Sequence, residues 1–124
     1  MAITKNAGRQ YTLVADVDMT AAMIPAVAVY EAVDLPAGAI VTGGTLEVIT
    51  VDAGGGTVKI QVGAVELLAA TAVSSALRVF LTETPVITTA PDTVDVEVET
   101  AVLTTFEGRL TIEYVIDGKT NEVQ

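Results

Sequence analysis

The chain has 124 residues and contains neither cysteine nor histidine. This length is typical of one domain that can bury a hydrophobic core. The lack of cysteine excludes disulfides and cysteine-based metal sites. The lack of histidine removes the commonest general base and metal ligand. We therefore expect a single domain over residues 1–124, with no cofactor and no enzymatic activity.

Sixteen acidic side chains against six basic ones give a net charge of −10. Nucleic acids and anionic membranes bind cationic surfaces, so neither is an expected partner. No run of about 18 apolar residues is present that would span a bilayer. Residues 1–8 lack the apolar segment of a secretory signal, which predicts synthesis in a cytoplasm, followed by use in that compartment or release by lysis.

The first third of the chain shows two alternating runs separated by an irregular stretch. We interpret residues 1–8 as an arm, followed by a strand in which one face carries Tyr11, Leu13, Ala15 and Val17. Residues 18–25 are expected to form a loop, because Pro25 would stop a helical turn there. A second strand is predicted over residues 27–34.

The central stretch from Leu35 to Gly63 predicts two strands joined as a β-hairpin. Leu46 and Val48 alternate with Glu47 and Ile49 before the three glycines at 54–56, and the second strand places Val58, Ile60 and Val62 on one face. Glycines permit the positive φ of a tight reversal. Pro36 and Gly38 predict a further turn at the start of this stretch.

The second half contains one ambiguous stretch and two clear strands. Residues 64–75 fit either a short helix or a strand that turns at Ser74, and residues 78–82 are short and β-like. Glu107-Gly108 is predicted as a turn, and residues 119–124 as a polar tail. The clear strands carry Val94, Val96 and Val98, and then Leu110, Ile112, Tyr114 and Ile116.

Seven or eight short strands without a convincing helix predict an all-β fold. Their short spacing and abundant Val and Thr favour an antiparallel β-sandwich of the jelly-roll or Greek-key type. The arm and the tail would be its two short ends.

Acidic side chains suggest two kinds of chemical site, and both are disfavoured. Asp95, Glu97 and Glu99 share one face of a strand, as a calcium or glycosidase site would require, but a solvated face predicts the same alternation. Asp52 and the triple glycine match neither a calcium loop nor a phosphate-binding loop. We predict a turn there, with no catalytic residue and no metal.

The most apolar irregular stretch carries Met19, Met23, Ile24, Pro25 and Val27. Such a loop is either tucked over the end of the sandwich or buried against another subunit. Both alternatives remain open at this point.

Three pieces of the sequence together resemble small virion structural proteins of tailed bacteriophages. They are AITKNAGRQYTLVADVD at residues 2–18, LPAGAIVTGGTLEV with TVKIQVG at 35–63, and GRLTIEYVIDGKTNEVQ at 108–124. Proteins of this pattern look like capsid decoration, or cement, proteins. The resemblance implies a β-rich protein, usually trimeric, on the outer capsid surface over joints between major capsid subunits. Residues 64–90 depart most from the pattern, which leaves a head or a tail location open.

The leading hypothesis is therefore a decoration protein, made in the host cytoplasm, that stabilises the shell by bridging major capsid subunits as a homotrimer. We expect Met19, Met23, Ile24, Pro25 and Val27 at or near a subunit or capsid interface, with Ile3 and Lys5 of the arm ordering on contact. The alternative is a receptor- or glycan-binding module of a tail or fibre. Two Phe, three Tyr and no Trp offer little for sugar stacking.

Overall fold

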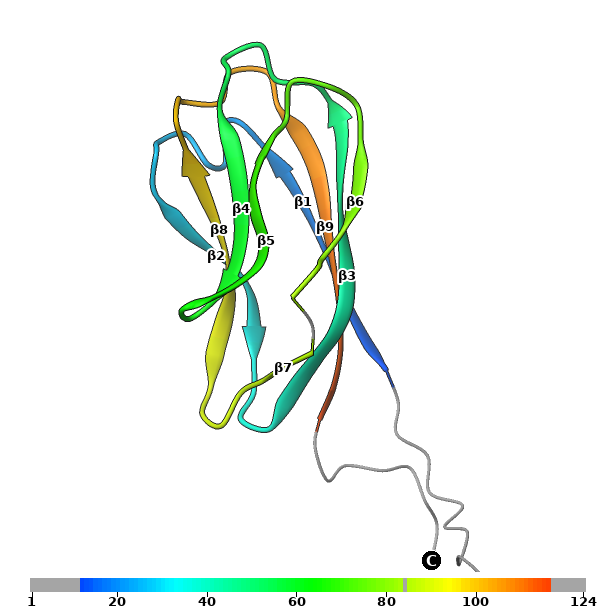
Figure 1. The fold of residues 1–124 in the computed structure, drawn as a ribbon. Coiled ribbons are helices and arrows are strands. Elements are labelled where there is room, and N and C mark those ends of the chain that lie inside the picture. The colour runs from blue at the N-terminus through cyan, green and yellow to red at the C-terminus, as the bar shows by residue number, and fades with distance from the viewer. Residues whose placement is uncertain (1–11, 84, 117–124) are drawn as a thin grey trace, which may run out of the picture.

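Two antiparallel sheets face each other across one hydrophobic core in the computed structural model, which describes residues 12–83 and 85–116 (Figure 1). The first sheet has the order β1-β9-β3-β6, with β7 also pairing with β3, and the second has the order β2-β8-β4-β5. The strands are β1 (Leu13–Thr20), β2 (Val29–Leu35), β3 (Ala39–Thr50), β4 (Thr57–Val62), β5 (Val65–Ala72), β6 (Arg78–Phe80), β7 (Val86–Ile87), β8 (Asp92–Glu99) and β9 (Glu107–Ile116).

The connectivity is that of a jelly roll. Within the described chain, only the β4–β5 and β6–β7 connections stay inside one sheet, and every other connection crosses to the opposite sheet. β6 and β7 both pair with β3, so they form one interrupted edge strand and complete an eight-position double Greek key. The predicted all-β antiparallel sandwich is confirmed.

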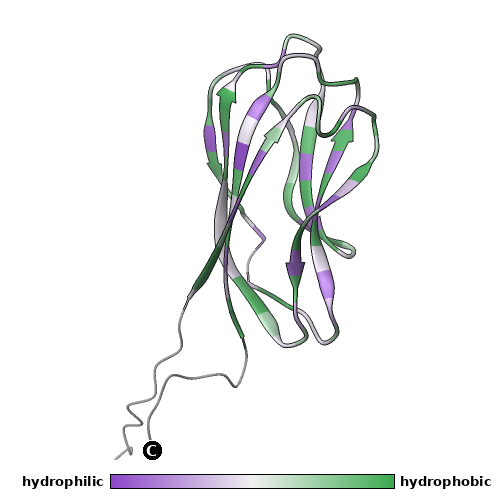
Figure 2. Cartoon of the chain, turned by 180° about the vertical axis from the view of Figure 1, so that it is seen from behind, coloured by the Kyte–Doolittle hydropathy of each residue, from purple (hydrophilic) through white to green (hydrophobic). Residues whose placement is uncertain are grey.

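The core forms from the alternating apolar positions that the sequence displays. Val58, Ile60 and Val62 of β4 are buried, as are Val94, Val96 and Val98 of the neighbouring β8. Between them, polar side chains turn outward, which gives the strands their green and purple bands in Figure 2. The predicted inward faces of these strands and of Leu46 and Val48 in β3 are therefore confirmed.

The predicted hairpin over Leu35–Gly63 is wrong in its pairing. β3 lies between β9 and β6 in the first sheet, whereas β4 lies between β8 and β5 in the second. The turn at Pro36 also joins the two sheets rather than neighbouring strands. Alternation identifies the buried face of a strand but not the strand it pairs with. Glycines at positive φ occur in crossovers as well as in hairpins, here Gly38 at 81° and Gly55 at 78°.

Four local predictions also require correction. β1 continues through Thr20, which pairs with Glu107, so the loop predicted from residue 18 begins three residues later. Glu107 and Gly108 open β9 instead of forming a turn, and a Cβ at position 108 would lie 2.5 Å from the ring of Phe106. Residues 65–72 form β5, so the helical alternative is wrong, and β2 starts at Val29 rather than at residue 27.

One buried carboxylate holds two crossovers together at the end of the sandwich away from the described chain ends. Asp52 is 2% exposed. Its Oδ1 accepts hydrogen bonds from the backbone N–H groups of Thr104 at 2.6 Å and Thr105 at 3.2 Å, and its Oδ2 from those of Gly54 at 2.9 Å and Gly56 at 3.4 Å. The β3–β4 and β8–β9 connections are thereby fixed to each other.

The hydrogen bonds to Asp52 also determine its ionisation. Burial alone would raise the pKa of Asp52 because it penalises the charged form. The four backbone N–H donors favour the carboxylate and together outweigh burial, so the pKa is lowered below its usual value of 3.8. The group is charged at neutral pH.

Replacing this carboxylate should weaken the fold. We expect Asp52→Asn to reduce the free energy of unfolding at neutral pH by about 2–3 kcal/mol, because an amide nitrogen would face backbone donors. Urea denaturation measures the difference, and Asp34→Asn at an exposed position is the control, expected within about 0.5 kcal/mol of wild type.

The stability difference between wild type and Asp52→Asn should depend on pH. The pKa of Asp52 is lower in the folded chain than in the unfolded chain. Its contribution to the free energy of unfolding is therefore fully present above the pKa of the unfolded chain and is lost as pH falls through the pKa of the folded chain. The stability difference between wild type and Asp52→Asn should therefore shrink below about pH 4. A difference that stayed constant down to about pH 2 would contradict the assigned role of the carboxylate.

Candidate interaction surfaces

The connections at the Asp52 end form a surface that we call the loop end, made of residues 21–28, 51–56, 73–77 and 100–106. It is the upper end in Figure 1, opposite the start of β1 and the end of β9. Several apolar side chains are exposed in or beside these connections: Met23, Val27, Ile49, Val51 and Val102. Exposed apolar groups gathered at one end of a protein favour contact with a partner.

The β1–β2 connection is held by backbone and side-chain hydrogen bonds. The N–H groups of Met23 and Ile24 donate to the carbonyl of Thr20, at 3.0 and 3.3 Å. The hydroxyl of Tyr30 accepts from the N–H of Ala26 at 2.8 Å and donates to its carbonyl at 3.2 Å. This connection is therefore braced before any partner binds.

The structure divides the five apolar residues that the sequence singled out in this stretch. Met19 and Ile24 are buried in the core, at 3% and 5% exposure. Met23 is 60% exposed and Val27 53%, and Pro25 is exposed beside them. The loop therefore buries one set of its side chains against the sandwich and exposes the other set to solvent. The interface role stays a prediction, and Ile3 and Lys5 lie outside the described residues.

A small apolar hollow lies beneath this connection. Its volume is about 330 Å³, and its walls come from β1, β2, β8 and the β1–β2 connection: Val17, Met19, Met23, Ile24, Tyr30, Glu31, Ala32 and Val96. Met23 lies at its rim because it is both a lining residue and exposed. Alternation along the strands predicts the core members, but the hollow depends on how the loop folds back.

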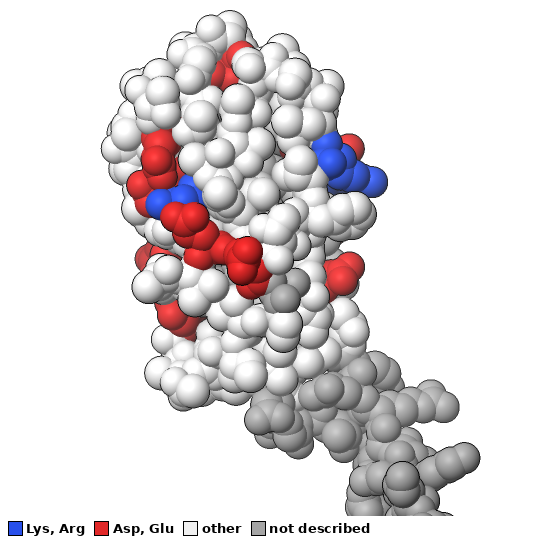
Figure 3. Space-filling model, viewed as in Figure 1, with Lys and Arg blue, Asp and Glu red and all other residues white. Residues whose placement is uncertain are grey.

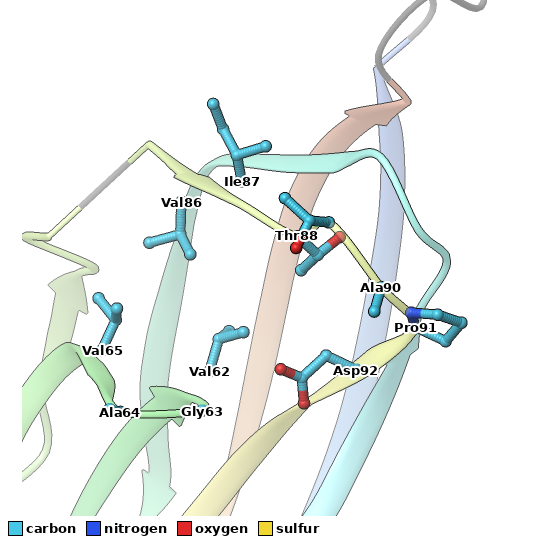
Figure 4. A pocket seen from close by; sticks show the side chains of 11 residues that line it. Val62, Gly63, Ala64, Val65, Val86, Ile87, Thr88, Ala90, Pro91 and Asp92 are labelled. Carbon is cyan, nitrogen blue, oxygen red and sulfur yellow. The ribbon is translucent and has the colours of Figure 1, made fainter.

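A second hollow of about 270 Å³ lies at the opposite end, between β7 and the β4–β5 turn. Figure 4 shows Val62, Val65 and Val86 around it, with Ile87 on the other side of the β7 backbone. Ile87 and Phe80 are both strongly exposed on the interrupted edge strand. Sequence reasoning missed this exposure, because β6 and β7, of three and two residues, are too short to show alternation.

The outer faces of both sheets carry ion pairs within a mainly acidic surface. On the second sheet, Lys59 lies within 3.1–3.5 Å of carboxylate oxygens of Glu66, Glu97 and Glu99, inside a band of acidic side chains (Figure 3). The pKa of Lys59 is raised, chiefly by its hydrogen bond to Glu99. No group of three acidic residues in the described chain is placed to hold a metal ion. That this face is solvated and carries no metal or catalytic site stays a prediction.

On the first sheet, four neighbouring strands place an acid, a base, an acid and a base side by side. The register aligns Asp18 of β1, Arg109 of β9, Glu47 of β3 and Arg78 of β6. The Nε of Arg109 donates to Asp18 Oδ1 at 2.8 Å, and Arg78 lies 3.8 Å from Glu47. Each of the three basic residues in the described chain thus has an acidic partner.

No helix in the part of the chain that the structure describes is long and apolar enough to cross a membrane.

Comparison with known proteins finds similarity in structure alone. No protein-family model and no curated protein sequence matches the chain. Among solved structures, a chain of the acidic stable capsid structure of Helicobacter pylori bacteriophage KHP30 is similar with a TM-score of 0.64 and 22% identity, covering 94% of this chain and 98% of that one.

Two further capsid structures contain chains of the same fold. One is the cyanophage Pam1 capsid asymmetric unit, with a TM-score of 0.61, 21% identity, and 94% and 91% of the two chains covered. The other is the capsid of Ralstonia phage GP4, with a TM-score of 0.61 and 19% identity, covering 95% of this chain and 90% of that one. The chain therefore shares its fold, over nearly its whole length, with chains of bacteriophage capsid structures. At the level of the fold, this confirms the resemblance to phage virion structural proteins.

Two methionines of the same stretch should respond differently to truncation. We expect Met19→Ala to lower the free energy of unfolding by about 2–4 kcal/mol, because it leaves a cavity in the core. Met23→Ala should stay within about 0.5 kcal/mol of wild type, because its side chain already meets solvent. Urea denaturation of both variants checks this, and equal losses would contradict the division of the loop.

Lys59 should stabilise the second sheet through its charge. Lys59→Gln leaves three carboxylates close together without their cation, so its melting temperature should fall below that of wild type at low ionic strength. The deficit should shrink in about 1 M salt, where screening acts over about 3 Å. Lys59→Arg is the matched control and should keep most of the stability. A deficit independent of salt would argue for packing instead.

Proposed function

We propose that this protein is a structural component of a bacteriophage virion, specifically a capsid decoration protein on the outer surface of the head. It binds the major capsid protein and stabilises the shell by bridging neighbouring capsid subunits, after synthesis in the host cytoplasm. The observation that carries the proposal is the fold shared along nearly the whole chain with chains from three phage capsid structures.

The surface of the sandwich supports binding rather than catalysis. The chain has no histidine or cysteine, and its described acidic residues are not grouped as a metal site. The outer faces of the sheets carry mostly charged side chains that suit solvent, whereas Met23, Val27 and Val102 form an exposed apolar group at the loop end. Phe80 and Ile87 are also exposed, on the interrupted edge. We propose that the loop end, with Met23 and Val27, contacts the shell, and that the protein is not an enzyme.

The bridging role favours a homotrimer. A single sandwich that touches the shell through a few loops would bury less than the roughly 1,200–2,000 Å² of a stable interface. Three linked copies around a threefold axis of the shell bind with an avidity far above that of one contact, provided that all three engage together. A trimer over a joint between capsid subunits meets this condition.

The first test is the copy number of the chain in purified particles. Quantitative mass spectrometry should find it in numbers comparable with the major capsid protein. A few copies per particle would instead favour the alternative, a receptor- or glycan-binding module of a tail or fibre. Absence from particles would overturn the virion role.

The second test separates the proposed contact surface from the rest of the protein. Met23→Asp with Val27→Asp should abolish co-sedimentation with shells that lack the chain, while thermal stability stays close to wild type, because both side chains are exposed. Ile87→Asp, at the opposite end of the sandwich, is the matched control and should bind normally. Unchanged binding of the double variant would remove the loop end from the contact.

A further inference from the structure

The four edge strands of the sandwich differ in how regular they are. β6 and β7 form an interrupted edge, and the pairing of β2 with β8 shifts register between Glu31 and Val33. The pairing of β5 with β4 shifts register twice. Only β1 is regular among the described edges: it pairs with β9 over eight residues without a shift. Short, interrupted or bulged edges resist further pairing, whereas a long regular edge accepts another strand.

The outer face of β1 is acidic, which restricts what can pair with it. Asp16 and Asp18 point to this face, and Glu113 of β9 lies beside Val14. Asp18 keeps 74% of its side chain exposed although Arg109 binds it from one side. A second β1 paired along its length would place Asp16 opposite Asp16 or Asp18, and like charges directly opposite are destabilising. The edge therefore fits a basic extended segment.

The chain itself contains such a segment. The three basic residues of the described chain are all ion-paired, and the others are Lys5, Arg9 and Lys119. Residues 1–11 carry two of these and no acidic residue. Lys5 and Arg9 are an even number of positions apart, so an extended backbone places both on one side, as β1 places its two aspartates.

The length of this segment is also sufficient. Eleven extended residues span about 36 Å, whereas the eight residues of β1 span about 27 Å. The segment joins the body at the start of β1, at the end opposite the loop end. It can therefore cover the β1 of an adjacent copy while the loop end stays free for another partner.

We propose that residues 3–9 of one copy add as a strand to the β1 edge of the next copy, with Lys5 and Arg9 facing Asp16 and Asp18. The contact is head to tail, so it closes into a ring when the rotation between copies allows. It rests on the trimer proposed above and not on the shell contact. The second copy thus supplies two further cations to an edge on which, in the described chain, only Asp18 has a basic partner, Arg109.

Cross-linking of the full-length chain tests the placement, and the lack of native cysteine makes it specific. Chains carrying Ala7→Cys are co-expressed with tagged chains carrying Val14→Cys, an exposed position on β1, and treated with a short bis-maleimide. We expect a covalent dimer of one tagged and one untagged chain. The matched control replaces Val14→Cys with Ile87→Cys, an exposed position on the opposite edge, and should give little of this product. Equal yields, or none, would overturn the proposal.

A chain carrying both Ala7→Cys and Val14→Cys tests whether the segment folds back on its own β1. The proposal predicts cross-links between copies, seen as covalent dimers and trimers under denaturing conditions. Cross-links only within one chain would overturn it.

Charge reversal provides an independent readout. Lys5→Glu with Arg9→Glu should raise the concentration at which the trimer dissociates by on the order of tenfold or more, measured by analytical ultracentrifugation. Combining it with Asp16→Lys and Asp18→Lys should restore association, and Lys119→Glu is the control without effect. Unchanged association of the first variant overturns the strand exchange. The proposal makes no claim about shell binding by these variants. A trimer that forms but does not bind shells would therefore contradict only the proposed function.

Discussion

The carboxylate of Asp52 is the interaction on which the arrangement of this sandwich depends most. It accepts backbone hydrogen bonds from its own connection and from the β8–β9 connection, and so fixes two crossovers at the loop end. Thr88, 5% exposed, has the matching role at the other end: its hydroxyl donates to the Pro36 carbonyl at 2.9 Å, and its carbonyl accepts from the Gly38 N–H at 2.8 Å. These are the two buried polar side chains of the described core, and each satisfies backbone groups that a crossover would leave unpaired.

Fixed crossovers have a consequence for binding. The loops that carry Met23 and Val102 are held by hydrogen bonds within the subunit, so their backbone loses little conformational entropy when a partner covers the exposed side chains. The faces of the sheets differ from this end, because they carry charged side chains, mostly acidic and some of them ion-paired, that suit water. Apolar loops at one end, charged side chains on the faces and one regular edge at the side would allow contacts with the shell and with other copies to use separate surfaces.

The sequence predicts the faces of the strands far better than their neighbours. Val58, Ile60 and Val62 are buried as their alternation indicates, because a period of two depends only on the strand itself. The hairpin between β3 and β4 was wrong because pairing depends on distant strands, and the glycine loop is compatible with either connection. Asp52 was predicted to be part of a turn, but its bonds to Thr104 and Thr105 span more than fifty positions and leave no local signal. Met19 and Met23 look alike in sequence, yet only the pairing of β1 with β9 makes one of them core.

Cryo-electron microscopy of the virion tests the central claim most directly, because it gives position, copy number and assembly state in one map. The account predicts density for jelly-roll sandwiches on the outer surface of the head, in threefold groups over joints between major capsid subunits, with the loop end toward the shell. Sandwiches found only at the tail, inside the head, or as isolated single copies would contradict it.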